Sequence, residues 1–274
     1  MADVRFRAGC PSRCSDEWGD WQLGSVGYGA TMSVGVIGLG YVGLPLAMAF
    51  GEAGERVVAV DVDQRKVSSI ASGQSYIEHI PSERLQGVLR SLEPTTHYAP
   101  LARADAVLIC VPTPLTRNRE PDLGPLTACA RSLAEVLQQG QLVVLESTTY
   151  PGTTREKLAP VLEESGLSVG DGFNLAFSPE RVDPGRTDHT LRDTPKVLGG
   201  MTEVCAERAE ELYRRVCDVV VRVSTPEAAE MTKLLENIFR SVNIALVNEL
   251  TVLSDRMGID IWEVVDAAAT ASTP

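Results

Sequence analysis

The order of apolar and amphipathic segments is the feature of this sequence that most limits its fold. From Met32 onward, short apolar runs alternate with helical patterns, and glycines or polar turns separate them; the clearest runs are 33–38, 56–63, 104–114 and 141–148. Strands that alternate with helices of about 10–15 residues form βαβ units. Such units build a parallel sheet with helices on both faces. We therefore predict an α/β fold with a doubly wound parallel sheet.

The last 50 residues follow a different pattern. No glycine or proline occurs from Glu227 to Met257, which predicts one helix of about 30 residues, and a second helix follows from Asp260. We expect a poorly ordered extension over 1–31, an α/β domain over 32–224 and a helical domain over 225–274. A helix with apolar residues on most of its faces needs a partner, so we also expect a homodimer through it.

A glycine motif lies between the first predicted strand and the first predicted helix. Gly38, Gly40 and Gly43 form G-x-G-x-x-G, and Asp61 ends the second strand 18 residues after Gly43. In this fingerprint the glycines permit a tight turn, a close pyrophosphate and a closely packed helix, while the acid binds the adenosine ribose. A carboxylate there repels a 2′-phosphate, so we predict a Rossmann-like domain that binds NAD. The alternative is a glycine turn in a non-binding α/β fold. The predicted cofactor-binding residues are Gly38, Leu39, Gly40, Tyr41, Val42, Gly43, Asp61, Lys66, Thr113 and Thr148.

Three loops follow predicted strand ends, at residues 111–114, 146–154 and 178–185. In open α/β sheets, ligands bind at the carboxyl ends of the strands. We expect Thr113, Ser147 and Thr148 to contact the nicotinamide side of the cofactor, and Glu180 to act as an acid or base. Ordinary turn and capping roles for these residues are the alternative.

The long predicted helix carries a polar stripe. Lys233, Asn237 and Ser241 are spaced four apart among apolar neighbours, which places them on one side of the helix. We expect this helix to be largely buried, and a buried lysine stabilises a developing alkoxide. A partly exposed surface stripe is the alternative. We expect Glu227 and Glu230 to serve the start of this helix, where acids suit the dipole.

Charge and cysteine content exclude several functions. The chain has 37 acidic and 25 basic residues, a net charge of −12, so we expect neither nucleic acid nor an anionic membrane as a partner. The apolar runs are too short to span a bilayer, and the first residues lack a signal-peptide pattern, so we expect a cytoplasmic protein. Cys10 and Cys14 have no partner pair for zinc, and no metal site is predicted. We assign no function to His189.

Four motifs together resemble one family. They are VIGLGYVGLPLA (36–47), ESTTYPGTT (146–154), SPERVDPG (178–185) and KLLENIFRSVNIALVNEL (233–250). In order and spacing they resemble the nucleotide-sugar dehydrogenases of the UDP-glucose/GDP-mannose dehydrogenase family, over about Ser33–Thr270. The third motif is similar to that of the UDP-N-acetylglucosamine 6-dehydrogenase branch, because Pro184 replaces a second carboxylate that UDP-glucose enzymes have.

The resemblance implies a chemistry. The family oxidises the C6 alcohol of a nucleotide sugar to a carboxylate with two NAD, through a thiohemiacetal and a thioester on a cysteine, for polysaccharide biosynthesis. Carried over by motif, Thr148 and Asn237 position the water, Glu180 is the acid or base and Lys233 stabilises the oxyanion. The substrate it implies is a UDP-sugar, with UDP-N-acetylglucosamine favoured.

The family's cysteine lies in a Gly-Gly-His-Cys segment beyond the helices, and no cysteine follows Cys217 here. We therefore expect a C-terminally truncated member, without the second nucleotide-binding domain, that binds NAD but makes no uronic acid by itself. Two alternatives stay open. A β-hydroxyacid dehydrogenase also joins a dinucleotide domain to a helix with a Lys-x₃-Asn pair and needs no cysteine. The third possibility is a non-catalytic remnant that binds NAD or dimerises.

Overall fold

A computed structural model describes residues 31–181 and 191–270 of the chain. The chain divides into two units within helix α7 (Pro226–Met257), with the first unit ending at Asn237 and the second including the residues from Ile238 on. The predicted extension over 1–31 lies outside the described residues except for position 31. The boundary predicted near residue 224 stays a prediction.

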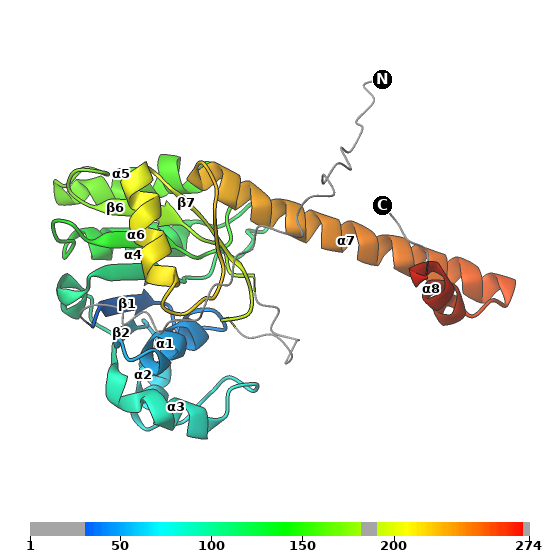
Figure 1. The fold of residues 1–274 in the computed structure, drawn as a ribbon, viewed down its shortest axis with the longest axis horizontal. Coiled ribbons are helices and arrows are strands. Elements are labelled where there is room, and N and C mark those ends of the chain that lie inside the picture. The colour runs from blue at the N-terminus through cyan, green and yellow to red at the C-terminus, as the bar shows by residue number, and fades with distance from the viewer. Residues whose placement is uncertain (1–30, 182–190, 271–274) are drawn as a thin grey trace, which may run out of the picture. The chain divides into compact units, whose positions relative to one another are not determined.

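The first unit is built on an eight-stranded sheet with the order β3-β2-β1-β4-β5-β6-β7-β8 (Figure 1). The strands are β1 (Ser33–Ile37), β2 (Arg56–Val60), β3 (Leu92–Thr95), β4 (Ala106–Ile109), β5 (Leu142–Leu145), β6 (Asn174–Phe177), β7 (Lys196–Gly200) and β8 (Val220–Arg222). The chain runs outward from β1 to β3, then returns to place β4 on the other side of β1. This reversal confirms the doubly wound fold, and it places the switch point, where ligands bind in such sheets, between β1 and β4.

One strand pair departs from the predicted parallel sheet. β7 pairs antiparallel with β6, whereas the other neighbouring strands pair parallel. The predicted parallel sheet is thus present with one exception, the antiparallel pair of β6 and β7. A parallel neighbour needs a crossover connection, usually a helix, and the polar, proline-containing sequence from Ser178 to Pro195 has no helical pattern to supply one.

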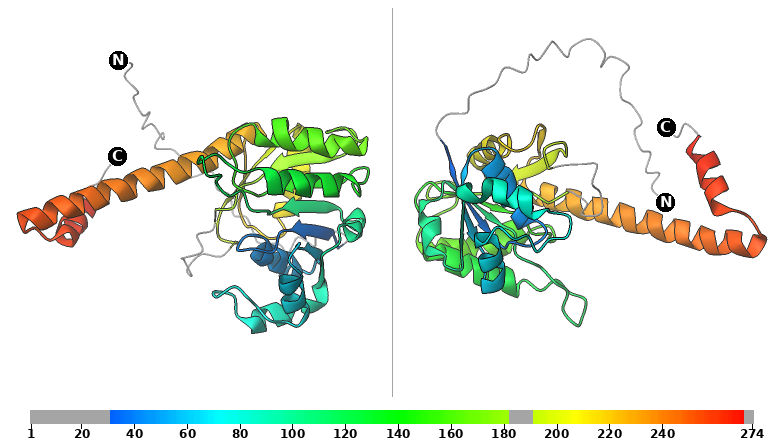
Figure 2. Two further views of the ribbon diagram at one scale, coloured as in Figure 1. Left: turned by 180° about the vertical axis from the view of Figure 1, so that it is seen from behind. Right: turned by 90° about the horizontal axis from the view of Figure 1, so that it is seen from below.

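Helices cover both faces of the sheet and produce two hydrophobic cores. The helices of this unit with seven or more residues, α7 apart, are α1 (Gly43–Glu52), α2 (Gln64–Ala71), α3 (Ser82–Val88), α4 (Gly124–Ala134) and α6 (Glu203–Tyr213). Side chains of α1, α3 and α6 pack in one core and those of α4 in the other. Figure 1 shows α6 and α1 in front of the sheet, and the view from behind in Figure 2 shows the green helices on the other face.

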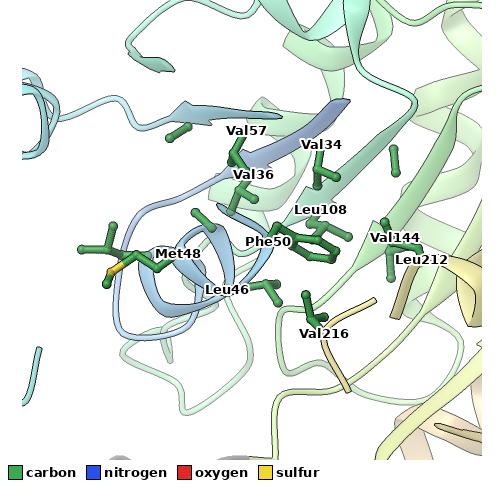
Figure 3. Packing of buried hydrophobic residues seen from close by; sticks show 14 of the residues in the cluster. Val34, Val36, Leu46, Met48, Phe50, Val57, Leu108, Val144, Leu212 and Val216 are labelled. Carbon is green, nitrogen blue, oxygen red and sulfur yellow. The ribbon is translucent and has the colours of Figure 1, made fainter. Parts of the chain in front are cut away.

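The core beneath α1 depends on the alternation of side chains along each strand. Val34 and Val36 of β1 point to the face covered by α1, while Ile37 packs in the opposite core. Figure 3 shows Phe50 of α1 among side chains from β1, β4 and α6. Phe50 has no exposed surface, and burying a side chain of this size contributes about 1.5–3 kcal/mol. This packing holds α1 against β1.

Other segments of the sheet layer were predicted less well. Residues 82–95 form α3 and β3, although their sequence pattern predicted no element. β3 contains Pro94, and a proline is tolerated in a strand at the edge of a sheet, which is where β3 lies. Residues 154–165 have a helical sequence pattern, and they form a run of three short helices, namely η3 (Thr154–Leu158), α5 (Ala159–Leu162) and η4 (Glu163–Ser165).

The long helix is present as predicted. α7 has 32 residues, and α8 (Ile261–Ala269) follows after Gly258, with the Asp260 side chain accepting a hydrogen bond from the Trp262 N–H at 2.9 Å. The buried residues of α7 all lie in its first turns, which pack on the sheet layer. They are Pro226, Ala229 and Glu230. None of the helices in the described ranges combines the length and apolarity that a bilayer-spanning segment needs.

Candidate active site

The glycine turn between β1 and α1 has the geometry that its sequence predicts. Gly38 has φ +91°, and a Cβ there would lie 2.6 Å from the Cys110 carbonyl oxygen. A Cβ on Gly43 would lie 1.8 Å from the Gly38 carbonyl oxygen, whereas a Cβ on Gly40 would meet nothing within 4 Å. The first and third glycines therefore permit close backbone packing. The second leaves open space, where a ligand can approach the backbone.

The start of α1 can receive an anion, although the N–H groups of Leu44 and Leu46 already donate to the Gly40 and Val42 carbonyl oxygens at 3.1 and 3.2 Å. No side chain caps this helix end, and no acidic residue occupies its first turn. The first N–H groups of a helix have no intrahelical partner, and they carry the positive end of the dipole. A pyrophosphate fits such an end because its charge and its acceptor oxygens match the donors. The open space at Gly40 and the uncapped helix together fit the phosphates of NAD.

Asp61 lies at the end of β2, beside the turn. Its Oδ2 accepts hydrogen bonds from the Leu39 N–H at 2.8 Å and from Lys66 Nζ at 2.9 Å, and its Oδ1 accepts one from the Asp63 N–H at 2.9 Å. These bonds keep the buried carboxylate at the turn. Arg65, the other nearby cation, pairs with Asp63 instead and lowers the pKa of that carboxyl to about 2. Lys66 is therefore the basic residue that contacts Asp61.

The loops after β4 and β5 are joined to each other. The Thr113 hydroxyl donates to the Thr148 carbonyl oxygen at 2.6 Å, and the Ser147 hydroxyl donates to the Val111 carbonyl oxygen at 2.6 Å. These bonds bring Thr113, Ser147 and Thr148 together, and their contact with the nicotinamide stays a prediction. Thr148 is exposed and Thr113 is half-buried, so both lie at the surface of this edge of the sheet.

A buried charge network underlies the loop that carries Glu180. Lys196 of β7 donates from Nζ to Glu146 Oε2 at 2.6 Å and to the Pro179 carbonyl oxygen at 3.2 Å, and Nζ lies 3.8 Å from Glu180 Oε2. The Tyr213 hydroxyl donates to Glu146 Oε1. Burial lowers the pKa of Lys196, but the nearby carboxylates of Glu146 and Glu180 outweigh it and raise that pKa overall. Lys196 therefore stays charged and holds the Ser-Pro-Glu loop from below.

The network residues Glu146, Lys196 and Tyr213 were not predicted as site residues from the sequence. Glu146 lies in the quoted ESTTYPGTT motif and Lys196 begins the KVLGG strand, yet each looks like an ordinary residue in its own segment. The available signal was a charged residue beside a buried apolar strand, because charged residues are almost never fully buried without a partner. The side chains of Lys196 and Glu146 are 2% and 0% exposed.

The first turns of α7 are attached to two of these loops. Glu230 accepts hydrogen bonds from the Gly152 N–H at 2.6 Å, the Thr154 N–H at 2.9 Å and the Thr154 hydroxyl at 2.7 Å. Its carboxylate therefore caps η3 rather than its own helix, and the prediction for Glu230 was wrong in this respect. Glu227 lies in the first turn of α7 as predicted and pairs with Arg155 at 2.6 Å.

The loop after β6 is attached further along the same helix. Arg181, the residue after Glu180, pairs with Glu236 of α7 at 2.6 Å, and it also donates to the Pro195 carbonyl oxygen at 2.7 Å. Lys233 and Asn237 lie on the stretch of α7 that these contacts attach to the two loops. The helix is not largely buried as predicted, because Lys233 is half-buried and Asn237 is exposed. The α7 side chains that surround them are also partly open to solvent in this chain.

Three of the four cysteines in the described ranges, Cys110, Cys129 and Cys217, are poorly suited to nucleophilic chemistry. Burial raises the pKa of Cys129 to about 12 and that of Cys217 to about 11, and it raises the pKa of Cys110 as well. Because the thiolate is the reactive form, these three residues stay protonated at neutral pH. Over the described residues, no three His, Cys, Asp or Glu side chains are grouped to hold a metal. Cys10, Cys14, Pro184 and His189 lie outside the described residues.

Comparison with known proteins adds to this geometry. Residues 32–217 match the NAD-binding domain of the UDP-glucose/GDP-mannose dehydrogenase family, and residues 227–273 match its central domain. A UDP-N-acetyl-D-glucosamine 6-dehydrogenase of Pseudomonas aeruginosa is 38% identical over 87% of this chain and 57% of that protein. The structure is similar to that of a UDP-D-ManNAc dehydrogenase from Pyrococcus horikoshii, with a TM-score of 0.82 and 40% sequence identity. The match covers 89% of this chain and 59% of that one.

A 3-hydroxyisobutyrate dehydrogenase of Mycobacterium tuberculosis is only 17% identical, with a TM-score of 0.67 over 89% of this chain and 72% of that one. That likeness shows a shared fold alone. The present chain spans less than three-fifths of the length of these two nucleotide-sugar dehydrogenases. The four sequence motifs, the glycine turn and the family matches lead to one assignment. The chain belongs to the UDP-glucose/GDP-mannose dehydrogenase family and carries that family's NAD-binding domain.

Proposed function

We propose that this chain supplies the NAD site and part of the sugar site of an enzyme that oxidises the C6 alcohol of a UDP-sugar, UDP-N-acetylglucosamine by preference, to the uronic acid. The observation that carries the proposal is the attachment of two strand-end loops to α7. Glu230 holds the loop that follows Thr148, and Glu236 pairs with Arg181, the residue after Glu180. Relatives named for N-acetylglucosamine and for N-acetylmannosamine both match, and the Ser-Pro-Glu-Arg motif favours an N-acetylated sugar over glucose.

The proposed roles follow from charge and position. NAD, when bound at the glycine turn, supplies the electron acceptor. Glu180 takes the proton from the C6 hydroxyl, and the Lys233 ammonium stabilises the negative charge that develops on that oxygen. Oxidation of an alcohol to an acid adds one water oxygen, and we assign the orientation of this water to the Thr148 hydroxyl and the Asn237 amide. Lys196 keeps the loop of Glu180 in place beneath these groups.

Binding and NADH formation test this proposal together. NAD binding to the purified chain is measured by calorimetry, and NADH absorbance is then followed after addition of UDP-N-acetylglucosamine, UDP-N-acetylmannosamine, UDP-glucose or 3-hydroxyisobutyrate. The first oxidation, to the aldehyde, needs no thiol, so NADH up to the amount of chain is expected with the acetylated sugars. Glu180→Gln is expected to slow this step by about 10²–10⁴-fold. Failure to bind NAD, or NADH formed only with the small hydroxy acid, would overturn the proposal.

We propose in addition that the second unit forms a homodimer. Phe239, Val242, Leu246, Leu250 and Leu253 follow one another at intervals of three or four residues along α7, and their side chains are 43–69% exposed. A stripe of this spacing is typical of a helix that packs on a second helix. Sedimentation is expected to show a dimer for the wild-type chain and for the control Asn248→Glu. Leu246→Glu is expected to give a monomer, and a wild-type monomer at micromolar concentration would refute the dimer.

A further inference from the structure

The segment between α2 and α3 contacts the glycine turn at two points. Ile77 and Ile80 anchor this segment, residues 74–81, in the core, where they are 3% and 4% exposed. From this anchor the Tyr76 hydroxyl donates a hydrogen bond to the Leu39 carbonyl oxygen at 2.5 Å. The His79 ring also stacks on the Tyr41 ring, with 6.0 Å between centroids and 23° between planes. Neither contact is part of the G-x-G-x-x-G fingerprint.

Together with Asp61, Tyr76 holds the backbone around Leu39 in one orientation. The Leu39 N–H donates to Asp61 Oδ2 at 2.8 Å, and the Leu39 carbonyl accepts from Tyr76. A trans peptide unit is planar, so the carbonyl of one residue and the N–H of the next point in opposite directions. Fixing the Leu39 carbonyl therefore fixes the direction of the Gly40 N–H. This N–H leaves the turn on the side away from Tyr76.

The Gly40 N–H has the surroundings of a ligand donor. Within the part of the chain that the structure describes, no protein acceptor takes its hydrogen, while the Gly40 carbonyl accepts the Leu44 N–H at 3.1 Å. A Cβ on Gly40 would meet nothing within 4 Å. The group therefore lies beside open space at the start of α1. An anion there gains both from this N–H and from the dipole of the helix.

We infer that Tyr76 is a positioning residue for the pyrophosphate of NAD: its hydroxyl holds the Leu39 carbonyl so that the Gly40 N–H is directed at a phosphate oxygen before the ligand arrives. The inference rests on NAD binding at this turn. Burial, followed by the negative charges of Asp61 and Asp63, raises the pKa of Tyr76, so its hydroxyl keeps the proton that it donates. Preorganised donors bind more tightly because less conformational freedom is lost on binding.

The test compares ligands with and without phosphate. Tyr76→Phe removes one oxygen atom and keeps the ring, and Tyr98→Phe is the matched control because Tyr98 packs in the opposite core. Dissociation constants are measured for NAD and ADP-ribose by calorimetry and for adenosine by NMR titration. Tyr76→Phe is expected to weaken NAD and ADP-ribose about fivefold, as for the loss of one hydrogen bond. Adenosine binding and the melting temperature are expected to match those of Tyr98→Phe.

Each other outcome contradicts the inference. Equal NAD affinity in Tyr76→Phe and Tyr98→Phe would show that the hydroxyl does not position the turn. An equal loss for adenosine and NAD would show that Tyr76 acts on the adenosine side, through Asp61. Failure of the wild-type chain to bind NAD would refute the proposed function itself. In that case the ligand-free order parameter of the Gly40 amide still decides the inference, since it is expected to fall in Tyr76→Phe and an unchanged value would overturn it.

Discussion

Replacing Lys196 by methionine tests the buried charge network beneath Glu180. The substitution keeps the length of the side chain but removes the donor to Glu146 and to the Pro179 carbonyl oxygen. Both charged side chains are almost fully buried, so water cannot replace the lost partner. Removing one partner of a buried pair costs about 3–5 kcal/mol. For a domain of this size each kcal/mol lowers the melting temperature by about 2–4 °C, so a decrease of about 10 °C is expected.

The destabilisation is expected to depend on pH. Burial raises the pKa of Glu146, and in Lys196→Met no ammonium opposes that effect. A carboxyl whose pKa is higher in the folded than in the unfolded chain loses stability as pH rises from the unfolded value, about 4.3, toward the folded one. The difference from wild type should therefore be larger at pH 8 than at pH 5. Adding Glu146→Gln should remove this dependence, and it keeps an acceptor for Tyr213.

Urea unfolding at pH 5 and pH 8 measures the free energies of unfolding, and thermal unfolding measures the melting temperature. The matched control is Lys157→Met, because Lys157 is exposed and its loss is expected to change the free energy of unfolding by about 0.5 kcal/mol or less. The double variant, Lys196→Met with Glu146→Gln, should recover part of the lost free energy of unfolding, since it removes the unpaired buried charge. A Lys196→Met loss below about 1 kcal/mol, or one equal at both pH values, would refute the reasoning that an ion pair supports this loop.

Three further predictions concern the turn and its supports. Gly43→Ala should lower the free energy of unfolding by about 3 kcal/mol in urea, because the added Cβ has no room. In the control Gly87→Ala the added Cβ meets nothing within 4 Å, so this variant should stabilise α3 slightly. Glu230→Ala removes the acceptor of three hydrogen bonds and should lower the free energy of unfolding by about 2–4 kcal/mol, measured by thermal unfolding. The control Glu227→Ala breaks an exposed ion pair with Arg155 and should lower it by about 0.5 kcal/mol. Asp61→Asn should weaken NAD about tenfold and reduce the preference for NAD over NADP, measured by calorimetry.

The parts of the site that were predictable come from local patterns. The turn at Gly38 and Gly43 was predictable because its chemistry lies within one strand, one turn and one helix, and the required glycines stand in the sequence itself. Asp61 followed because the fold class places the end of the second strand beside that turn. The long helix α7 followed from the absence of glycine and proline over its length.

The parts that were missed depend on contacts between distant residues. Lys196 and Glu146 are 50 positions apart, and Tyr213 is 67 positions from Glu146, so no local pattern pairs them. The antiparallel return of β7 depends on the connection that precedes it rather than on the strand. The exposure of Asn237 was mispredicted because burial depends on what covers a helix, and the apolar composition of the helix does not show what covers it.

The alternation of strands and helices, the dinucleotide turn and the family to which they point could be read along the chain, because they follow from propensity, periodicity and the steric freedom of glycine over short stretches. The groups that support the site became visible only in the folded molecule. Lys196 lies under Glu180, Tyr76 holds the Leu39 carbonyl and Glu230 caps η3 because folding brings together segments that are far apart along the chain. The free energy of a buried charge or donor depends on the partner that it meets there.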